Sequence, residues 1–413
     1  MPEVTAARVT AAGPTRAATR VPWLDGVRGA AALFVVLHHT WLTAFPYFPE
    51  NHGPWWLGWA VYGHLAVAVF IVVSGFSLGL APARRGETLT GGTKTFLRRR
   101  AWRILPPYWA ALVLSMVFVA LITGPRTGAT VSAKTVAVYG LLVQDVVGAP
   151  VPNGVFWSIA IEWQIYFLFP LILWLGRRYG MRAAVAVTLI LVLLAHAAAV
   201  NVSSLARIDQ LLPQFLGLFV LGVVAARATV FPPSRLARRV VGAGSAALAA
   251  GFVGVAATVG PTWVVDHFFS VDLAVGGATA GLLLLMAAGS ARPGRRFFGS
   301  RPLLFLGLFS YSVYLVHAPL LETVWLYAVE PRHFAPLTSY FVLLATVPAV
   351  LAGCYLFFRV FEAPFLERRS LGALRAAAVR RLLPGKAAVA GTDTVAGTST
   401  VAGTEAAVPA AAD

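Results

Sequence analysis

The chain has 413 residues, of which 58% are hydrophobic and only 12% are charged, against about 25% charged in soluble domains. A disordered chain would be poorer in apolar residues, and a disulfide-stapled secreted domain would need more than the single Cys354. A soluble enzyme of this length would carry more charge, so a protein with many membrane spans remains. The net charge of +17 needs its own explanation, because it is also typical of nucleic-acid binders.

Ten segments are apolar and long enough, at about 20 residues, to cross the hydrocarbon core as helices. Their long continuous runs lack the alternation of barrel strands. We therefore predict an all-α, polytopic membrane helical bundle with about ten transmembrane helices. The stretch 131–147 is shorter and carries polar residues, so we predict an interfacial helix there. The predicted spans are 27–45, 57–81, 104–124, 156–175, 182–201, 210–228, 240–260, 268–289, 302–328 and 337–361.

The basic residues are distributed very unevenly over the connections between these spans. Of the 33 lysines and arginines, 27 fall on one side, four fall on the other, and two lie at span ends. The positive-inside rule places the basic side, and with it both termini, in the cytoplasm. The excess of basic charge is then explained by membrane topology. We therefore expect a multi-pass protein of the inner (plasma) membrane, with the lipid bilayer and not nucleic acid as its partner.

The two ends of the chain differ in composition from the predicted bundle. Residues 1–20 are rich in Ala, Thr and Arg, without the apolar core of a signal peptide, and we predict a disordered segment. Residues 21–366 form the predicted membrane domain. Residues 367–413 are first basic and then repeat Val-Ala-Gly-Thr, which predicts a disordered low-complexity tail.

The first span, LDGVRGAAALFVVLHHT, carries the sharpest pair of polar residues. Arg28 and His39 are eleven positions apart, which places them on one helix face with a rise of roughly 16 Å. His38 points away from that face, and Asp25 stands where an N-cap would be. The alternative is a snorkelling arginine with a histidine bonded to a neighbouring group.

Ionisable groups in two other spans are expected at the depth of His39, and such groups inside membranes are functional candidates. Glu162 in the fourth span could hydrogen-bond His39 and raise its basicity, or it could be a protonated glutamate bonded to a backbone carbonyl. His317 in the ninth span follows Ser310, Tyr311 and Tyr314. This pattern predicts a helix facing the bundle interior or a wet cavity, or simple interhelical hydrogen bonding.

Arginines cluster in the segment FLRRRAWRILPPYW, residues 96–109, just before the third span. Arginine forks suit phosphates, although anionic lipid or the positive-inside bias alone would explain them as well. In the last span Arg359 and Glu362 are three apart, so we expect a structural ion pair on one helix face.

Six segments in order resemble acyltransferase family 3, the bacterial integral-membrane O-acyltransferases, over roughly residues 23–366. The opening LDGVRGAAALFVVLHH, with its arginine and histidine, resembles the family's hallmark. The other segments that carry the resemblance are FIVVSGF, RRAWRILPPY, WSIAIEWQIYFLFP, SYSVYLVH and FRVFEAP. Each is weak alone, but their order is specific.

The resemblance implies transfer of an acyl group, commonly acetyl, from acyl-CoA to a hydroxyl of a cell-envelope glycan, a lipid-linked sugar or a secreted glycosylated metabolite. It implies that His39, Arg28 and Glu162 are catalytic, with acyl-CoA as co-substrate and with no metal or permanently bound cofactor. Phosphates of CoA would meet Arg99, Arg100 and Arg103. The supporting pocket would contain His317, Ser74, Trp157, Ser158, Tyr166 and Tyr314.

Several alternatives stay open from the sequence. His39 could act as general base or carry the acyl group transiently. A multi-span transporter or flippase with a Glu/His proton relay would also use carboxylates and histidines near the midplane. A structural membrane subunit would leave the aligned Arg28–His39 face unexplained. Some family members carry an extra periplasmic SGNH-type domain, and we expect this chain to be the membrane domain alone.

Overall fold

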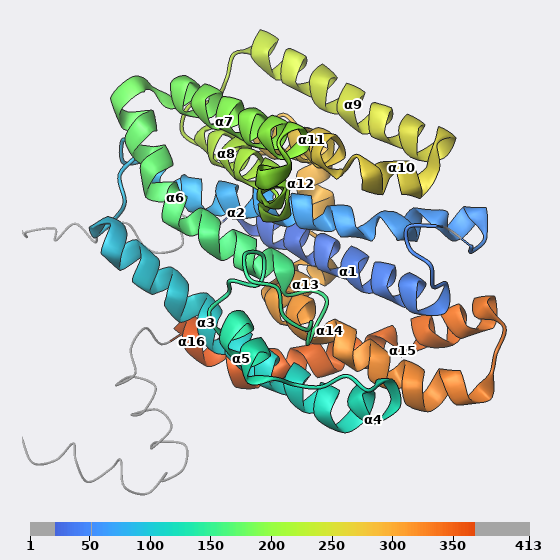
Figure 1. Cartoon of the computed structure of the whole chain (residues 1–413). Helices are drawn as coiled ribbons and strands as arrows, with labels where there is room; N and C mark the ends of the chain where they lie inside the picture. The colour runs from blue at the N-terminus through green and yellow to red at the C-terminus, as the bar shows by residue number, and fades with distance from the viewer. Residues whose placement is uncertain (1–20, 51, 368–413) are drawn as a thin grey trace, which may run out of the picture. The chain divides into compact units, whose positions relative to one another are not determined.

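The computed structural model describes residues 21–50 and 52–367, so the predicted N-terminal segment and all of the predicted tail except Glu367 lie outside it. The chain divides into two units, Met1–Ala363 and Pro364–Asp413, and the described part of the second is the end of a short helix. The described residues form helices and connections without a strand, which confirms the all-α prediction (Figure 1).

The helices follow one another through short connections. Three of the segments labelled η are 3-10 helices (η2, η4 and η6), and three are π-helices (η3, η5 and η7). In chain order the elements are α1 (Pro22–Ala44), η2 (Trp55–Leu65), α2 (Ala66–Ala83), α3 (Gly92–Phe118), η3 (Val119–Thr123), α4 (Gly124–Thr127), α5 (Ala133–Gly140), α6 (Trp157–Tyr179), α7 (Met181–Asn201), η4 (Ser203–Leu211), α8 (Gln214–Arg227), α9 (Arg235–Thr258), α10 (Gly260–Asp266), α11 (Phe268–Ala287), α12 (Arg292–Phe298), α13 (Arg301–Leu308), α14 (Ser310–Val324), η5 (Trp325–Val329), η6 (Glu330–Arg332), α15 (Pro336–Phe357), η7 (Phe358–Glu362) and α16 (Ala363–Glu367).

Nine helical stretches in the described part of the chain are long and apolar enough to cross a membrane. They correspond to nine of the ten predicted spans. The remaining predicted span is α1, which has 23 residues but is less apolar, because it carries Asp25, Arg28 and two histidines. The chain is therefore a multi-pass membrane protein. The predicted span 302–328 is broken at Phe309 into α13 and α14, and both of these helices pack against α1.

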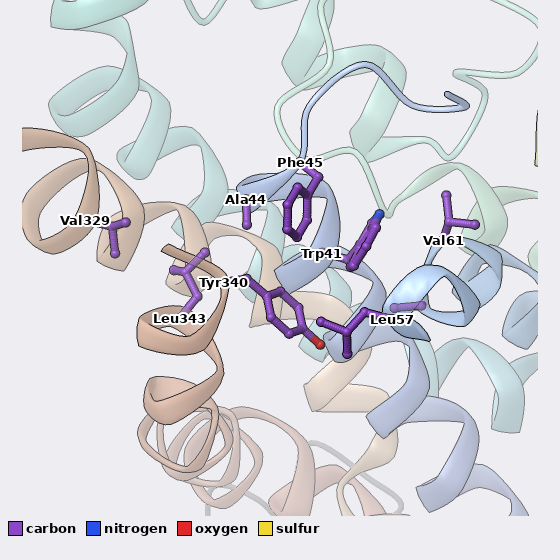
Figure 2. Close-up of a cluster of buried hydrophobic side chains, with 9 residues drawn as sticks. Trp41, Ala44, Phe45, Leu57, Val61, Val329, Tyr340 and Leu343 are labelled. Atoms are coloured by element: carbon purple, nitrogen blue, oxygen red, sulfur yellow. The ribbon is translucent and has the colours of Figure 1, made fainter. Parts of the chain in front are cut away.

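Helix α1 lies at the centre of the packing. It contacts α2, α13, α14, α15 and η2, and its ribbon runs between these elements in Figure 1. Figure 2 shows the buried cluster at its C-terminal end, where Trp41 and Phe45 pack against Tyr340 of α15 and Leu57 of η2. Burial of such large aromatic side chains stabilises a fixed position for this end of α1. The cluster therefore holds the turn that carries the two histidines.

Glycines allow backbones to touch where α1 meets α13 and α12 and where α2 crosses α8. A Cβ at Gly307 of α13 would lie 1.9 Å from the carbonyl oxygen of Asp25, and one at Gly26 of α1 would lie 1.7 Å from that of Phe298. At the crossing of α2 and α8, a Cβ at Gly222 would lie 2.1 Å from the Val72 carbonyl oxygen. No side chain fits at these positions, so the glycines set how closely α1 and α2 approach their neighbours.

Two elements lie at the edge of the packing. The predicted interfacial stretch contains the eight-residue helix α5, capped by the Ser132 hydroxyl, which accepts a hydrogen bond from the Thr135 amide. Helix α9 is long and apolar but contains no buried residue, and it packs mainly against α11. In a bilayer, most of its surface would face lipid.

Candidate active site

His39 of α1 and His317 of α14 are brought together by the packing of these two helices. Nε2 of His317 lies 3.2 Å from Nδ1 of His39, and the ring centroids are 4.7 Å apart. His317 is fully buried, whereas His39 is partly exposed. The two histidines therefore lie at the same level of the bundle, in agreement with the depth predicted from the sequence.

Backbone carbonyls decide which ring nitrogens carry protons, because a carbonyl oxygen can only accept a hydrogen bond. Nδ1 of His317 lies 2.7 Å from the Val313 carbonyl oxygen, so its Nε2 is an acceptor in the neutral ring. Nδ1 of His39 lies 2.9 Å from the Val35 carbonyl oxygen, so this nitrogen is the donor toward both Val35 and His317. Nε2 of His39 then keeps its lone pair, and it has no hydrogen-bond partner within residues 21–50 and 52–367.

Glu162 does not bond His39, so the carboxylate–histidine pair, one of the two interpretations left open by the sequence, is wrong. Instead, Glu162 accepts a hydrogen bond of 2.6 Å from Tyr166, one turn along α6, and Tyr166 lies 3.3 Å from the Ser74 hydroxyl of α2. Equal depth in a membrane does not fix the direction in which a side chain points around its helix. In this bundle α14, and not α6, faces His39.

Arg28 lies in a polar layer separated from the histidines by three turns of α1. It forms an ion pair of 2.7 Å with Asp25 and donates to the Ser77 hydroxyl of α2. Asp25 is therefore not the N-cap that the sequence suggested, because α1 begins at Pro22 with Val21 as its cap residue. The charge of Glu162 also acts on Arg28, which places the carboxylate in this layer.

Two of the three predicted phosphate-binding arginines belong to the same layer. Arg100 interacts electrostatically with Arg28, Arg103 and Glu162, and its guanidinium lies over the ring of Phe96. Its Nε is buried and has no partner in the described part of the chain. Arg103 is exposed but close enough to act on Arg28. Arg99 is exposed and makes none of these interactions.

The remaining supporting residues connect α6 to its neighbours. Ser158 and Tyr314 share a hydrogen bond of 2.6 Å, and the ring of Tyr314 lies 6.3 Å from that of His317. Trp157 stacks on Phe215 of α8 at a centroid distance of 5.9 Å. The sequence-predicted pocket residues are thus divided between a histidine layer and an arginine layer, with α6 passing through both.

The predicted ion pair between Arg359 and Glu362 is also wrong. Glu362 is 2% exposed and accepts a hydrogen bond of 2.6 Å from Ser312 of α14, whereas Arg359 lies over the ring of Tyr355. Both residues belong to the π-helix η7, whose wider turn rotates positions three apart away from one another. The carboxylate therefore points inward while the guanidinium stays exposed.

Two further histidines lie beside this site, and sequence reasoning did not select them. His38 is 4% exposed, and its ring centroid lies 5.3 Å from that of His39 and 5.8 Å from that of His64. The His-His pair in the first span was the available signal. Helix periodicity correctly predicted that His38 points away from the face that carries Arg28. It does not predict which residues of other helices lie beside His38.

The fold and the site define a multi-pass helical membrane protein with a paired histidine and a separate arginine layer buried in its bundle. The chain belongs to acyltransferase family 3: the family's model, described as an acyltransferase domain, matches residues 21–359. Residues 21–359 thus form an acyltransferase family 3 domain, as the six sequence motifs predicted.

Three curated relatives are similar to this chain. The acyltransferase MdmB of Streptomyces mycarofaciens is 28% identical over 318 residues, which cover 72% of this chain and 78% of MdmB. YrhL of Bacillus subtilis, provisionally named a peptidoglycan O-acetyltransferase, is 28% identical over 45% of this chain and 28% of its own length. The peptidoglycan O-acetyltransferase OatA of Listeria monocytogenes is 25% identical over 36% of this chain and 24% of its own length. No solved structure matches the chain significantly.

Proposed function

We propose that this protein transfers an acyl group, most simply acetyl, from acyl-CoA to a hydroxyl of a glycan or a glycosylated acceptor. The observation that carries the proposal is the fixed tautomer of His39, which leaves Nε2 as a base next to a partly open side of the ring. The names of the peptidoglycan O-acetyltransferase relatives support a sugar acceptor.

In the direct route, Nε2 of His39 takes the proton of the acceptor hydroxyl as the oxygen attacks the thioester carbonyl. The carbon–sulfur bond then breaks, the acyl group stays on the acceptor oxygen, and the thiolate leaves with the proton from His39. While His39 is protonated, its Nδ1–H continues to donate to Val35 and His317, which stabilises the imidazolium and keeps its orientation. His317 thus acts as a positioning residue.

In the covalent route, Nε2 attacks the thioester carbonyl, the carbon–sulfur bond breaks and CoA leaves as its thiolate, so that Nε2 carries the acyl group. The acceptor oxygen then attacks this acyl group, the acyl–nitrogen bond breaks, and Nε2 takes the proton of the acceptor hydroxyl, which balances the charge of the released thiolate. Both routes use the same nitrogen. Incubation with labelled acetyl-CoA, without an acceptor, separates them: label that remains on the protein after rapid acid quench, and is lost in His39→Gln, supports the covalent route. Absence of label during active turnover supports direct transfer.

The arginine layer would bind the phosphates of CoA. Arg28 and His39 are separated by eleven residues, a rise of roughly 16 Å along α1. An extended pantetheine arm can cover such a separation and present its thioester to His39. The unpaired Nε of Arg100 and the exposed guanidinium of Arg103 supply donors that suit phosphate oxygens.

The proposed donor side agrees with the charge distribution of the sequence. Of the 33 basic residues, 27 fall on the side of the bundle that carries Arg100 and Arg103. The positive-inside rule makes this the cytoplasmic side, where acyl-CoA is made, and it also places both termini there. The protein would then lie in the plasma membrane and use an acceptor that reaches His39 from the opposite side or from the lipid.

A turnover assay with purified protein tests this function. The enzyme should cleave acetyl-CoA slowly with water and faster when a soluble glycoside acceptor is added, with the acetyl group recovered on the sugar. A transporter or flippase would leave acetyl-CoA intact. Failure of the purified, folded protein to bind or cleave acetyl-CoA would contradict the proposal.

A further inference from the structure

His38 and His64 present two ring nitrogens without partners beside the catalytic histidine. Nδ1 of His38 lies 2.9 Å from the Ala60 carbonyl oxygen, and Nδ1 of His64 lies 3.3 Å from that of Val61. Both carbonyls can only accept, so each neutral ring is protonated on Nδ1 and keeps Nε2 as an acceptor. Neither Nε2 has a partner among the described residues, and that of His64 is enclosed.

Two phenylalanines complete a cluster with these imidazoles. The rings of His38, His64 and Phe48 lie at centroid distances of 5.8 Å from one another. Phe268 of α11 lies against His64 at 4.7 Å. Phe48 belongs to the connection between α1 and η2 and is 37% exposed, whereas His38 is 4% exposed. Phe48 is thus the ring past which a ligand would enter.

An enclosed acceptor without a partner is costly, and such groups are usually satisfied. A ligand that donates hydrogen bonds would satisfy both nitrogens. The two lone pairs would repel an anion. A cation is not favoured either, because no carboxylate in the described part of the chain bonds either ring. Neutral hydroxyl groups fit the two acceptors, and the apolar ring faces fit the C–H face of a sugar.

The cluster continues the row of imidazoles that contains the proposed reacting nitrogen. Centroid distances along the row are 4.7 Å from His317 to His39, 5.3 Å from His39 to His38, and 5.8 Å from His38 to His64. A sugar with one hydroxyl at Nε2 of His39 therefore has its other hydroxyls within the same neighbourhood.

We propose that His38 and His64, enclosed by Phe48 and Phe268, form the subsite that binds the acceptor sugar through hydroxyls adjacent to the one that is acylated. This inference rests on the proposed function, because it assigns the acceptor half of the same site. His38 and His64 are binding residues in this account and take no part in cleavage of the thioester.

The test compares substitutions that keep one imidazole nitrogen at a time. Asparagine places its amide near the position of Nδ1 and removes the Nε2 acceptor, whereas glutamine reaches the position of Nε2. Purified His38→Asn, His38→Gln, His64→Asn and His64→Gln are assayed with acetyl-CoA alone and with a panel of soluble glycosides that includes an N-acetylglucosamine trisaccharide. His267→Gln, which changes an exposed histidine, is the matched control.

Each asparagine variant should raise the KM for the glycoside about tenfold, which corresponds to one lost hydrogen bond. The KM for acetyl-CoA and the rate at which water cleaves acetyl-CoA should both stay within about twofold of wild type. Retained cleavage would also show that the variants fold. Glutamine should recover part of the glycoside affinity. The control should behave as wild type with both substrates.

The outcomes separate this inference from the proposed function. Unchanged glycoside KM in both asparagine variants, or an equal loss of acetyl-CoA cleavage, would overturn the subsite and assign the rings to folding or proton movement. A wild type that cleaves acetyl-CoA but acylates no glycoside would overturn the sugar subsite while leaving the donor half intact. A wild type inert toward acetyl-CoA would contradict the proposed function itself.

Discussion

The hydroxyls of Ser158 and Tyr314 lie 2.6 Å apart and join α6 to α14 about one turn before His317. Both side chains are buried, so either hydroxyl would lack a partner without the other. Through this bond, α6 fixes the rotation of the helix that presents His317 to His39. The helix that carries Glu162 therefore supports the histidine pair without supplying a carboxylate to it.

Tyr314→Phe should lower the stability of the protein by about 1–3 kcal/mol, because Ser158 is left buried and unpaired. Thermal unfolding in detergent measures the change. Tyr327→Phe is the control, because Tyr327 is 56% exposed and its hydroxyl makes no hydrogen bond with the described residues. Equal stability of the two variants would show that the Ser158–Tyr314 bond contributes nothing.

His317→Leu should lower kcat by about 10–100-fold, the equivalent of losing a hydrogen bond to a charged group in the transition state. The KM for acetyl-CoA should stay near its wild-type value. His317→Gln retains an oxygen acceptor toward His39 and should recover part of kcat. A role in packing alone would give Gln no advantage over Leu, and that result would remove His317 from the mechanism.

Arg100→Gln and Arg103→Gln should each raise the KM for acetyl-CoA about tenfold or more, because each removes a charge-assisted hydrogen bond to phosphate. Arg99→Gln is the matched control on the same helix and should change this KM by less than about twofold. The KM for dephospho-CoA thioesters provides a further measure of phosphate binding. If all three variants are equivalent, the arginines act only as a general positive surface.

Gly222→Ala should destabilise the bundle by about 1–3 kcal/mol or more, because its Cβ would lie 2.1 Å from a backbone carbonyl that cannot turn away. Gly254→Ala, on the unburied helix α9, meets no atom within 4 Å and should be neutral or stabilising by up to about 1 kcal/mol. Thermal unfolding of the two variants in detergent gives the comparison. A neutral Gly222→Ala would mean that α2 and α8 can separate freely.

Much of the fold could be predicted from the sequence, because a span is set by length and apolarity, which are local properties. Nine predicted spans reappear as helices long and apolar enough to cross a membrane, and α1 is the tenth helix. The break at Phe309 and the π-helix η7 could not be predicted, because both depend on how neighbouring helices pack. The rotation of residue 362 away from residue 359 follows directly from that π-helix.

The depth of the two paired histidines in the candidate site was predictable from the sequence, but the pairing of its side chains was not. His39 and His317 were expected at one depth, and they meet. Glu162 was expected at the same depth and turns instead toward Tyr166. Depth along a helix follows from residue number, but the direction of a side chain depends on which helices surround it, and a single sequence does not contain that information.

The rate of acetyl-CoA turnover by His39→Ala, measured beside wild type with glycoside present, tests the central claim most directly. We expect this rate to fall by at least about 10²–10⁴-fold, the contribution of a positioned acid–base group, while binding of CoA is retained. Transfer at the wild-type rate by His39→Ala would contradict the claim that Nε2 of His39 is the atom that acts on the substrates.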